Sequence, residues 1–331
     1  MKIDVFCHIL PSKYKEAINQ KVLPAVYRPY QATHEDFPTL VDLETRFKVM
    51  DEHKGLVQVL TLTVPFVESV VPAKDAIELA KIGNNELAEL VEKYPDRFVA
   101  AIGNLPMNDI DAALDELNRI VNELHFRGIQ LCTNINGKPL DAPEFMPLYE
   151  EMEKYNLPIL LHPARLDTVT DYITESTSKY GIHHIFGWPY NTSAAMARLV
   201  FGRVLQKYPN IKFITHHCGA MIPYFEQKIS SFYSHRKRSG FIKGFNRSVL
   251  EYLKMFYADT ALNGSVSGLM CGYAFFGADH ILFGTDMPYD SQNGYLVVQE
   301  TIRSIDQMEI ADSEKKMIFE DNARELLHLQ I

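Results

Sequence analysis

The 331-residue sequence contains little cysteine and less positive than negative charge. Its four cysteines, at positions 7, 132, 218 and 271, are widely spaced and form no C-x-x-C pair, so neither a zinc ribbon nor a disulfide framework is suggested. The net charge is −9, and we expect no nucleic-acid partner, because neutralising phosphates requires a basic face. The densest basic run, His235–Arg238, is short and predicts a solvated helix end or loop.

Long apolar runs are also absent from the sequence. The longest of them fall far short of a membrane-spanning length. The first residues run directly into a strand-like segment, without the cationic stretch, long apolar region and cleavage site of a secretory signal. We therefore expect a soluble, cytoplasmic protein that has no membrane partner.

Short β-rich runs alternate with amphipathic helical patterns along the chain. The eight predicted strands are Lys2–Phe6, Leu56–Val64, Phe98–Gly103, Gly128–Leu131, Pro158–Leu161, Ile211–Thr215, Phe256–Ala258 and Asp279–Phe283. Eight β/α alternations predict an α/β protein, a single (β/α)₈ TIM barrel that forms one domain over residues 1–331. A doubly wound open sheet is the alternative, although no glycine-rich phosphate-binding motif follows any predicted strand.

The predicted helices and two longer segments complete this pattern. The predicted helices are Ala73–Tyr94, Ile110–His125, Pro143–Tyr155 and Thr192–Tyr208, with Asp109 as an N-cap. Two insertions, Ser12–Val41 and Thr168–Pro189, follow the first and the fifth strand. Loops at these carboxyl ends of strands build the active site of a barrel, so we expect both insertions to lie beside it.

Histidine or aspartate stands at the end of four predicted strands. His8 ends the first strand, His162 the fifth, His216 and His217 the sixth, and Asp286 the eighth. A barrel brings these ends into one ring, and imidazole and carboxylate are the ligands expected for zinc, manganese or iron. Each residue alone is commonly structural or a helix cap, but the set together indicates a metal site.

Short motifs occur essentially from one end of the chain to the other. They are Ile3-Asp4-Val5-x-x-His8-x-x-Pro11, Arg46-x-x-x-Met50-Asp51, Arg97-Phe98 with Leu105-Pro106, Gly128-Ile129-Gln130 with Asn134 and Asn136-Gly137, His162-Pro163, His216-His217-x-Gly219-x-x-x-Pro223, and Phe283-Gly284-Thr285-Asp286-x-Pro288. With these motifs the chain resembles the amidohydrolase superfamily, in the amidohydrolase-related branch that contains aminocarboxymuconate-semialdehyde decarboxylase and γ-resorcylate decarboxylase.

The resemblance implies a divalent metal bound by His8, His162 and Asp286, with zinc as the first choice, manganese as the second, and no organic cofactor. It implies His217 and Asp286 as catalytic groups, of which His217 polarises substrate or water and Asp286 takes part in proton transfer. His217 is favoured over His216, because adjacent side chains on a strand point to opposite faces. A homodimer is also implied.

One position departs from the family pattern. The first strand of the family carries H-x-H or E-x-H, but the earlier of these positions is Phe6 here, and a phenyl ring cannot bind a metal. Asp4 lies about 13 Å from His8 along an extended strand, and Cys7 points to the other face. We therefore expect three protein ligands, or four if His217 joins, and weaker metal binding than with the full motif; a metal-free or non-catalytic descendant is the alternative.

The remaining candidate residues concern the substrate. Arg165, close after His162, is predicted to bind a substrate carboxylate, and Arg46 lies in an arginine-containing segment of the family; a surface salt bridge and simple solvent exposure are the respective alternatives. Asp259 is expected either to accept a hydrogen bond from a neighbouring histidine or to cap a turn.

The sequence therefore predicts an enzyme, an amidohydrolase-type carboxy-lyase. We expect a metal-dependent, non-oxidative decarboxylase that acts on a small unsaturated or hydroxyaromatic carboxylic acid. One alternative is a metal-dependent hydrolase of a lactone, amide or imine bond, which would use the same residues. A barrel that binds a ligand without turnover is the other.

Overall fold

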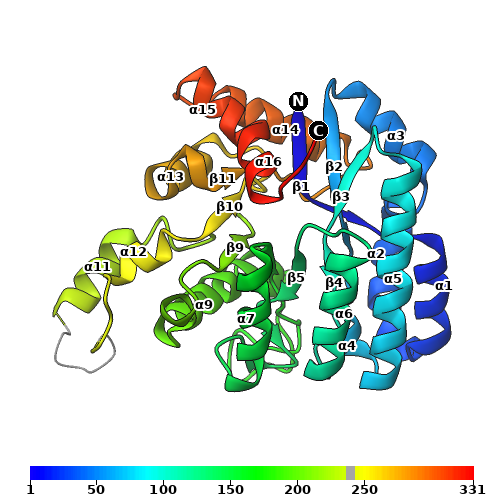
Figure 1. Cartoon of the computed structure of the whole chain (residues 1–331), viewed down its shortest axis with the longest axis horizontal. Coiled ribbons are helices and arrows are strands. Elements are labelled where there is room, and N and C mark those ends of the chain that lie inside the picture. Colours follow the sequence, from blue (N-terminus) through cyan, green and yellow to red (C-terminus); the bar gives the residue numbers. More distant parts are fainter. Residues whose placement is uncertain (236–242) are drawn as a thin grey trace.

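Parallel strands alternate with helices through the computed structural model, which describes residues 1–235 and 243–331 (Figure 1). The strands around the barrel are β1 (Lys2–Ile9), β2 (Leu56–Leu62), β3 (Phe98–Ala101) continued by β4 (Gly103–Asn104), β5 (Ile129–Cys132), β8 (Pro158–His162), β9 (Lys212–Thr215), β10 (Tyr257–Asp259) and β11 (Ile281–Leu282). Of the basic run for which a solvated helix end or loop is predicted, residues 236–238 lie outside the described part of the chain.

Hydrogen bonds join these strands into a ring. One sheet has the order β1-β2-β3 and the other β11-β10-β9-β8-β5-β4, with every pair parallel. The sheets meet where Ile102 donates to Leu60 O at 2.9 Å, and again where Val5 donates to Phe283 O at 3.0 Å. The predicted (β/α)₈ barrel is confirmed.

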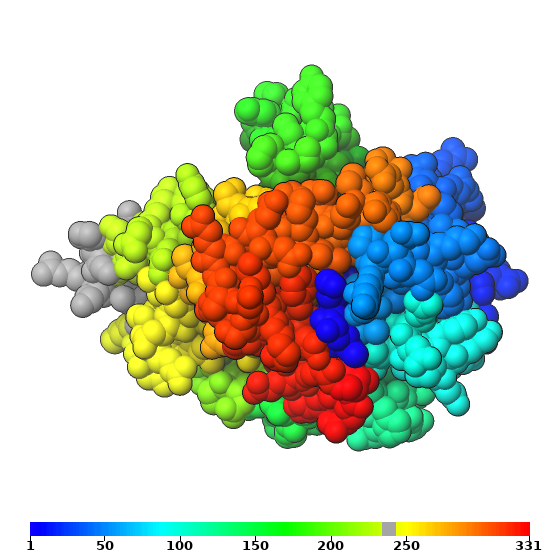
Figure 2. Space-filling view, turned by 90° about the horizontal axis from the view of Figure 1, so that it is seen from above, coloured from blue at the N-terminus to red at the C-terminus, as the bar shows by residue number. Residues whose placement is uncertain are grey.

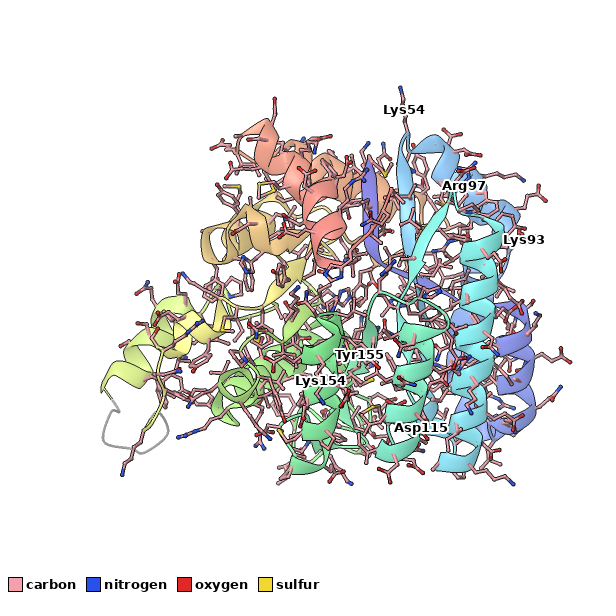
Figure 3. The ribbon with its side chains drawn as sticks, viewed as in Figure 1. Lys54, Lys93, Arg97, Asp115, Lys154 and Tyr155 are labelled. Atoms are coloured by element: carbon pink, nitrogen blue, oxygen red, sulfur yellow. The ribbon has the colours of Figure 1, made fainter. Side chains whose placement is uncertain are left out.

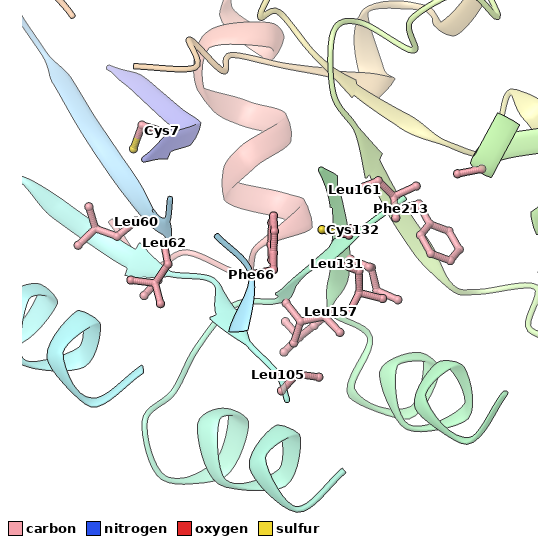
Figure 4. Packing of buried hydrophobic residues seen from close by; sticks show 14 of the residues in the cluster. Cys7, Leu60, Leu62, Phe66, Leu105, Leu131, Cys132, Leu157, Leu161 and Phe213 are labelled. Atoms are coloured by element: carbon pink, nitrogen blue, oxygen red, sulfur yellow. The ribbon is translucent and has the colours of Figure 1, made fainter. Parts of the chain in front are cut away.

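Alternation along the strands divides the core into two layers. Side chains such as Val59 and Leu160 point into the barrel, where they join residues of the C-terminal helix α16 (Asn322–Leu326). The opposite faces of the strands pack against the helices, and Leu60, Leu131, Leu161 and Phe213 belong to that layer (Figure 4). Because both faces are covered, β2 and β8 are buried along their whole length.

The helices cover the outside of the ring (Figure 1). They are α3 (Leu43–Glu52), α4 (Val67–Val70), α5 (Ala73–Lys93), α6 (Ile110–Asn122), α7 (Met146–Tyr155), α9 (Gly187–Phe201), α10 (Val204–Lys207), α11 (Glu226–His235), α12 (Val249–Leu253), α13 (Val266–Phe276), α14 (Tyr295–Asp306) and α15 (Asp312–Lys316). Asp109 caps α6 as predicted, since its side chain accepts a hydrogen bond from Ala112 N–H at 3.1 Å. The helix predicted over Thr192–Tyr208 is divided into α9 and α10, because Arg203 adopts a left-handed conformation with φ of 64°.

Short elements account for the other differences from the sequence-based prediction. The strand predicted at Asp279–Phe283 is shorter, because Ala278–His280 forms a 3₁₀ turn before β11. Further short elements are the 3₁₀ turns Pro38–Leu40 and Pro143–Phe145, the π-helical segment Met317–Asp321, and a hairpin of β6 (Asn134–Ile135) and β7 (Lys138–Pro139).

Both predicted insertions are present after β1 and β8. The first contains α1 (Ser12–Lys21) and α2 (Pro24–Asp36). The second consists mainly of turns with the short helix α8 (Ile182–Ile185), and Figure 2 shows it in green, projecting from the molecule. Both follow the carboxyl ends of barrel strands, which places them near the predicted site.

The outer surface carries the charged side chains. Lys54, Lys93, Asp115 and Lys154 are exposed, and Figure 3 shows Lys54 extending away from the ribbon. None of the helices in residues 1–235 and 243–331 combines the length and the hydropathy of a transmembrane segment.

Buried Asn84 links α5 to β4 and α6. Its amide group exchanges hydrogen bonds with both backbone groups of Asn104 at 2.9 and 3.0 Å and donates to Glu116 at 2.7 Å. We expect Asn84→Ala to lower the free energy of unfolding by about 2–4 kcal/mol, because two buried backbone groups lose their partner. Urea denaturation followed by circular dichroism measures this change. The exposed neighbour Asn85 is the control, and equal losses from Asn84→Ala and Asn85→Ala would contradict the prediction.

Candidate metal centre and active site

The first and last strands place His8 beside Asp286. The Asp286 N–H donates to Phe6 O at 2.8 Å, and His8 N–H donates to Met287 O at 2.8 Å. These bonds continue the contact between β1 and the segment after β11 to the open end of the barrel. As a result, His8 Nε2 lies 3.3 Å from Asp286 Oδ1. The Asp286 side chain is 24% exposed, so it faces the mouth of the barrel rather than the closed core.

A buried carboxylate fixes the loop that carries Asp286. Asp4 accepts hydrogen bonds from Thr285 N–H at 3.0 Å and from Thr285 Oγ1 at 2.6 Å. It also accepts one from Phe6 N–H at 3.3 Å. Burial raises the pKa of Asp4 to about 7, although the hydrogen bonds from Thr285 oppose this shift. Asp4 therefore supports the loop from below.

His216 lies directly after β9 and links two carboxylates. Its Nδ1 lies 2.5 Å from Asp259 Oδ2, and its Nε2 lies 3.6 Å from Asp286 Oδ2. Asp259 Oδ1 accepts from Cys218 N–H at 3.2 Å and Ala261 N–H at 3.1 Å, so this carboxylate is itself held firmly. Both His216 and Asp259 are fully buried.

His217 reaches the same cluster from an unusual backbone conformation. Its φ is 55°, and Cys218 and Ala220 also have positive φ, a costly conformation for residues other than glycine. His216, His217 and Asp286 each offer one ligand atom, and these three atoms lie within 4.8 Å of one another. The prediction that strand alternation separates His216 from His217 is wrong, because β9 ends at Thr215 and the chain turns there.

His162 completes the ring of imidazoles at the end of β8. Its ring centroid lies 5.3 Å from that of His8 and 6.0 Å from that of His216. Its Nδ1 lies 2.8 Å from Pro163 O, which assigns the ring proton to Nδ1 and leaves the Nε2 lone pair free. The structure thus brings the predicted residues His8, His162, His217 and Asp286 together.

Three of these imidazoles share one hydrogen-bond pattern. In each of them the Nδ1 atom lies beside an oxygen. Nδ1 of His8 lies 3.3 Å from Leu62 O, and Nδ1 of His162 and Nδ1 of His216 lie beside Pro163 O and Asp259 Oδ2. Histidines that bind metals almost always donate the other ring N–H in this way. The Nε2 atoms of His8 and His216 are buried and have no hydrogen bond of good geometry within the described residues. Unpartnered imidazole nitrogens beside a carboxylate fit a divalent metal ion.

The electrostatics of the cluster also favour a cation. Burial, with neighbouring imidazoles, lowers the pKa of His162 to about 3 and that of His217 well below its usual value. Burial acts in the same direction on His216, but Asp259 and Asp286 outweigh it and raise its pKa to about 10. Burial would raise the pKa of Asp286, yet His216 holds it well below its usual range. His162 and His217 are thus neutral, the form that binds metals, and Asp286 is ionised.

Phe6 forms the wall of the cluster where the family pattern has a ligand. Its ring stacks on His216 with a centroid distance of 4.0 Å and an interplanar angle of 10°. It also lies edge-on to His8 at 5.3 Å. Phe6 is fully buried, so this apolar ring excludes water from one side of the imidazoles.

Arg165 lies close to the mouth of the barrel. Trp188 Nε1 donates to Arg165 O at 3.1 Å, and the Trp188 ring lies 5.7 Å from that of His162. The Arg165 Nη2 contacts Val169 O and Thr170 O at 3.4 Å each, which are long hydrogen bonds. Its Nε is buried beside Gly187 and has no hydrogen-bond partner among the described residues.

Arg46 lies behind β1 and contacts protein atoms. It is fully buried, and it donates to His8 O at 2.7 Å and to Gln58 Oε1 at 2.8 Å. A weaker contact reaches Thr39 O at 3.4 Å. These bonds support the backbone of His8 from outside the cluster, and the substrate role predicted for Arg46 stays a prediction.

Sequence reasoning missed two aromatic residues of the mouth. Tyr289 lies 5.5 Å from His8 and pairs its hydroxyl with Thr63, and Phe66 lies 5.2 Å from His162. Both belong to loops after barrel strands, which is the one sequence signal that could have pointed to them.

Comparison with known proteins identifies the family of this barrel. A family model described as amidohydrolase matches residues 3–329. The chain belongs to the amidohydrolase family. Among its relatives, a 2-amino-3-carboxymuconate-6-semialdehyde decarboxylase from Dictyostelium discoideum is 29% identical over 290 residues, which cover 87% of this chain and 77% of the relative.

Two further relatives of this amidohydrolase-family chain are decarboxylases of aromatic acids. A gamma-resorcylate decarboxylase from Rhizobium sp. (strain MTP-10005) is 30% identical over 307 residues and 88% of each chain. The crystal structure of a dihydroxybenzoic acid decarboxylase from Polaromonas sp. JS666, with bound manganese and the inhibitor 2-nitroresorcinol, matches with a TM-score of 0.80 and 25% identity over 100% of this chain and 97% of the other. These relatives confirm the prediction of an amidohydrolase-type decarboxylase.

The position of Arg46 leads to a test of its role. We expect Arg46→Lys to lower the free energy of unfolding by about 1–3 kcal/mol, because a single ammonium cannot replace the bonds to both His8 O and Gln58. Urea denaturation measures the loss. Arg97→Lys is the control, since Arg97 is partly exposed and pairs with Asp51 at the surface. Unchanged stability together with a raised KM for substrate would instead favour direct substrate binding by Arg46.

Proposed function

We propose that this amidohydrolase-family protein is a metal-dependent decarboxylase of a small hydroxyaromatic or unsaturated carboxylic acid. The observation that carries the proposal is the convergence of His8, His162, His217 and Asp286 at the open end of the barrel. Relatives that decarboxylate aromatic and muconate acids support this reaction class.

The donor set fits a divalent first-row metal. We propose that His8, His162 and Asp286 bind it, with manganese and zinc as the two candidates and the bound manganese of the Polaromonas relative in favour of the first. When bound, such an ion would orient the substrate carboxylate or an adjacent hydroxyl group and stabilise negative charge there.

The protein residues would then move one proton. Asp286 or His217, after taking up a proton from solvent, would deliver it to the ring or vinyl carbon that carries the carboxylate, and a C–H bond would form. The C–C bond to the carboxylate breaks, carbon dioxide leaves, and the electron pair of that bond restores the conjugated system. Solvent returns the proton to the acid, so the reaction needs no oxidant, reductant or organic cofactor.

The surroundings of the site suit a small acid. The unpartnered Nε of Arg165 supports the binding of a second polar group or carboxylate on the substrate, and Trp188 and Phe66 supply aromatic surface beside His162.

We further propose a cytoplasmic homodimer. Exposed apolar side chains on and beside the second insertion support an interface between copies, with Ile173 fully exposed and Tyr180 89% exposed.

Replacement of Asp286 tests the proton transfer. We expect Asp286→Asn to slow the release of carbon dioxide from hydroxybenzoates or carboxymuconate semialdehydes by about 10²–10⁴-fold, since the amide cannot exchange the proton. Headspace analysis of carbon dioxide measures the rate. Asp115→Asn, at an exposed position of α6 (Figure 3), serves as the control. Turnover of lactones or amides without any release of carbon dioxide would favour the hydrolase alternative.

Removal of the metal tests the cofactor. We expect protein dialysed against a chelator to lose decarboxylation and to regain it with Mn²⁺ or Zn²⁺, because the neutral imidazoles and the carboxylate need a cation to bind the substrate anion. Metal analysis by mass spectrometry follows the occupancy in parallel. Full activity of protein that holds less than about a tenth of an equivalent of metal would contradict metal dependence.

Replacement of Arg165 tests the recognition of the acid. We expect Arg165→Met to raise KM about 10–100-fold with a smaller change in kcat, because a charge-assisted hydrogen bond to the substrate is lost. Steady-state kinetics measure both constants. Arg198→Met is the matched control, since Arg198 is 57% exposed and pairs with Asp141 on the outside of α9. Identical kinetics for the two variants would remove Arg165 from the site.

A further inference from the structure

The cluster contains one buried imidazole more than the proposed ligand set uses. Phe6 occupies the position of β1 where the family pattern has a histidine or glutamate, so β1 provides His8 alone. His216, from the far side of the ring, lies against the face of Phe6 at 4.0 Å. The lost donor of β1 and the additional imidazole after β9 are therefore direct neighbours in space.

The carboxylate of Asp286 lies close to the ring nitrogens of both His8 and His216. Two ligand atoms bound about 2.1 Å from one ion lie about 3.0–3.4 Å apart at the angles of octahedral and tetrahedral sites. His8 Nε2 lies 3.3 Å from Asp286 Oδ1, and His216 Nε2 lies 3.6 Å from Asp286 Oδ2. Each nitrogen thus lies near the separation expected of two ligands on one ion, and His216 also belongs, with His217 and Asp286, to a group whose ligand atoms lie within 4.8 Å of one another.

The hydrogen bonds behind His216 are those of a metal ligand, whereas those of His217 are not. His216 Nδ1 lies 2.5 Å from Asp259, and an ion that displaces the proton of Nε2 would bind at that nitrogen in the manner of carboxylate–histidine–metal sites. The His217 Nδ1 is buried and has no partner within the described residues. Of the two adjacent histidines, only His216 is thus oriented by a hydrogen bond from behind.

We infer that His216 supplies the metal ligand that β1 lacks, and that Phe6 holds its ring in position. The inference rests on the proposed metal-dependent function and concerns the same divalent ion. His8, His162, His216 and Asp286 then form four protein ligands, and His217 remains available to the substrate.

The packing explains why the two positions act as a pair. Phe6 is fully buried and stacks almost parallel to His216, so that the imidazole cannot rotate away from Asp286 without loss of that contact. Room for Phe6 comes from Gly284, where an added Cβ would lie 3.0 Å from the Cβ of Phe6. A residue at position 6 that binds the ion itself would have to turn toward the space that the His216 ring now fills.

Metal affinity provides the first test. We expect His216→Gln to weaken the binding of Mn²⁺ and Zn²⁺ by about 100-fold or more, since a ligand is lost, and Asp259→Asn to weaken it by about 10–100-fold, since the ligand is no longer oriented. Titration calorimetry on the chelator-treated, full-length protein measures both. His280→Gln, at a partly exposed position before β11, is the control and should bind like the wild type. Circular dichroism verifies that each variant folds. If His216→Gln does not fold, the metal affinity of Asp259→Asn still tests the inference.

Counting nitrogen ligands provides a readout that does not depend on activity. Cu²⁺-loaded protein gives superhyperfine splittings in electron paramagnetic resonance that report the number of bound imidazoles. We expect one nitrogen fewer in His216→Gln than in the wild type and an unchanged number in His217→Gln. Wild-type affinity and an unchanged nitrogen number in His216→Gln would overturn the inference.

A rescue experiment tests whether a metal ligand at position 6 can replace the ligand at position 216. We expect the double variant Phe6→His with His216→Gln to recover most of the metal affinity lost in His216→Gln alone, because it returns the donor to β1. A double variant that binds as weakly as His216→Gln would contradict this replacement. Wild-type protein that takes up neither Mn²⁺ nor Zn²⁺ would overturn the proposed function, whereas metal-binding wild type with unaffected His216 variants would overturn this inference alone.

Discussion

The backbone contact between β1 and the segment after β11 is the constraint on which the site depends. It joins the two ends of the sheet, and its last hydrogen bonds are the pairs between Phe6 and Asp286 and between His8 and Met287. The same bonds that complete the barrel therefore set His8 and Asp286 at contact distance. Asp4 strengthens the junction through Thr285, so that the contacts that close the barrel also position the site.

Buried charges and strained backbone conformations both occur close to this junction between β1 and the segment after β11. Asp286 and Asp259 place negative charge on either side of His216, in a region where burial would otherwise disfavour any charge. Asp286, His217 and Cys218 all adopt left-handed backbone conformations, each of which costs about 1–2 kcal/mol. The surrounding barrel core, packed along β2, β8 and β9, maintains these strained residues in place.

The features predicted correctly from the sequence are those that have a local sequence signature. The cap Asp109 at the start of α6 and the strand β8, predicted over Pro158–Leu161, agree with the structure, because caps and strands have local signatures. His8, His162 and Asp286 were found because they follow strands that a barrel must bring together. The left-handed Arg203, which lies between α9 and α10, has no such signature. The end of β9 at Thr215 has no local signature either. Strand alternation therefore wrongly predicts that the side chains of His216 and His217 point to opposite faces.

The ring of strand ends explains how a metal centre can survive the loss of one ligand. In a barrel each strand delivers its last side chains at a similar distance from the axis, so donors from different strands are geometrically interchangeable. Phe6 removes a donor from β1, but it also adds a flat apolar surface against which the imidazole that follows β9 can be fixed. In the arrangement that we infer, Phe6 and the buried His216–Asp259 pair belong together, because the imidazole after β9 supplies the ligand that β1 lacks for the proposed ion beside Asp286.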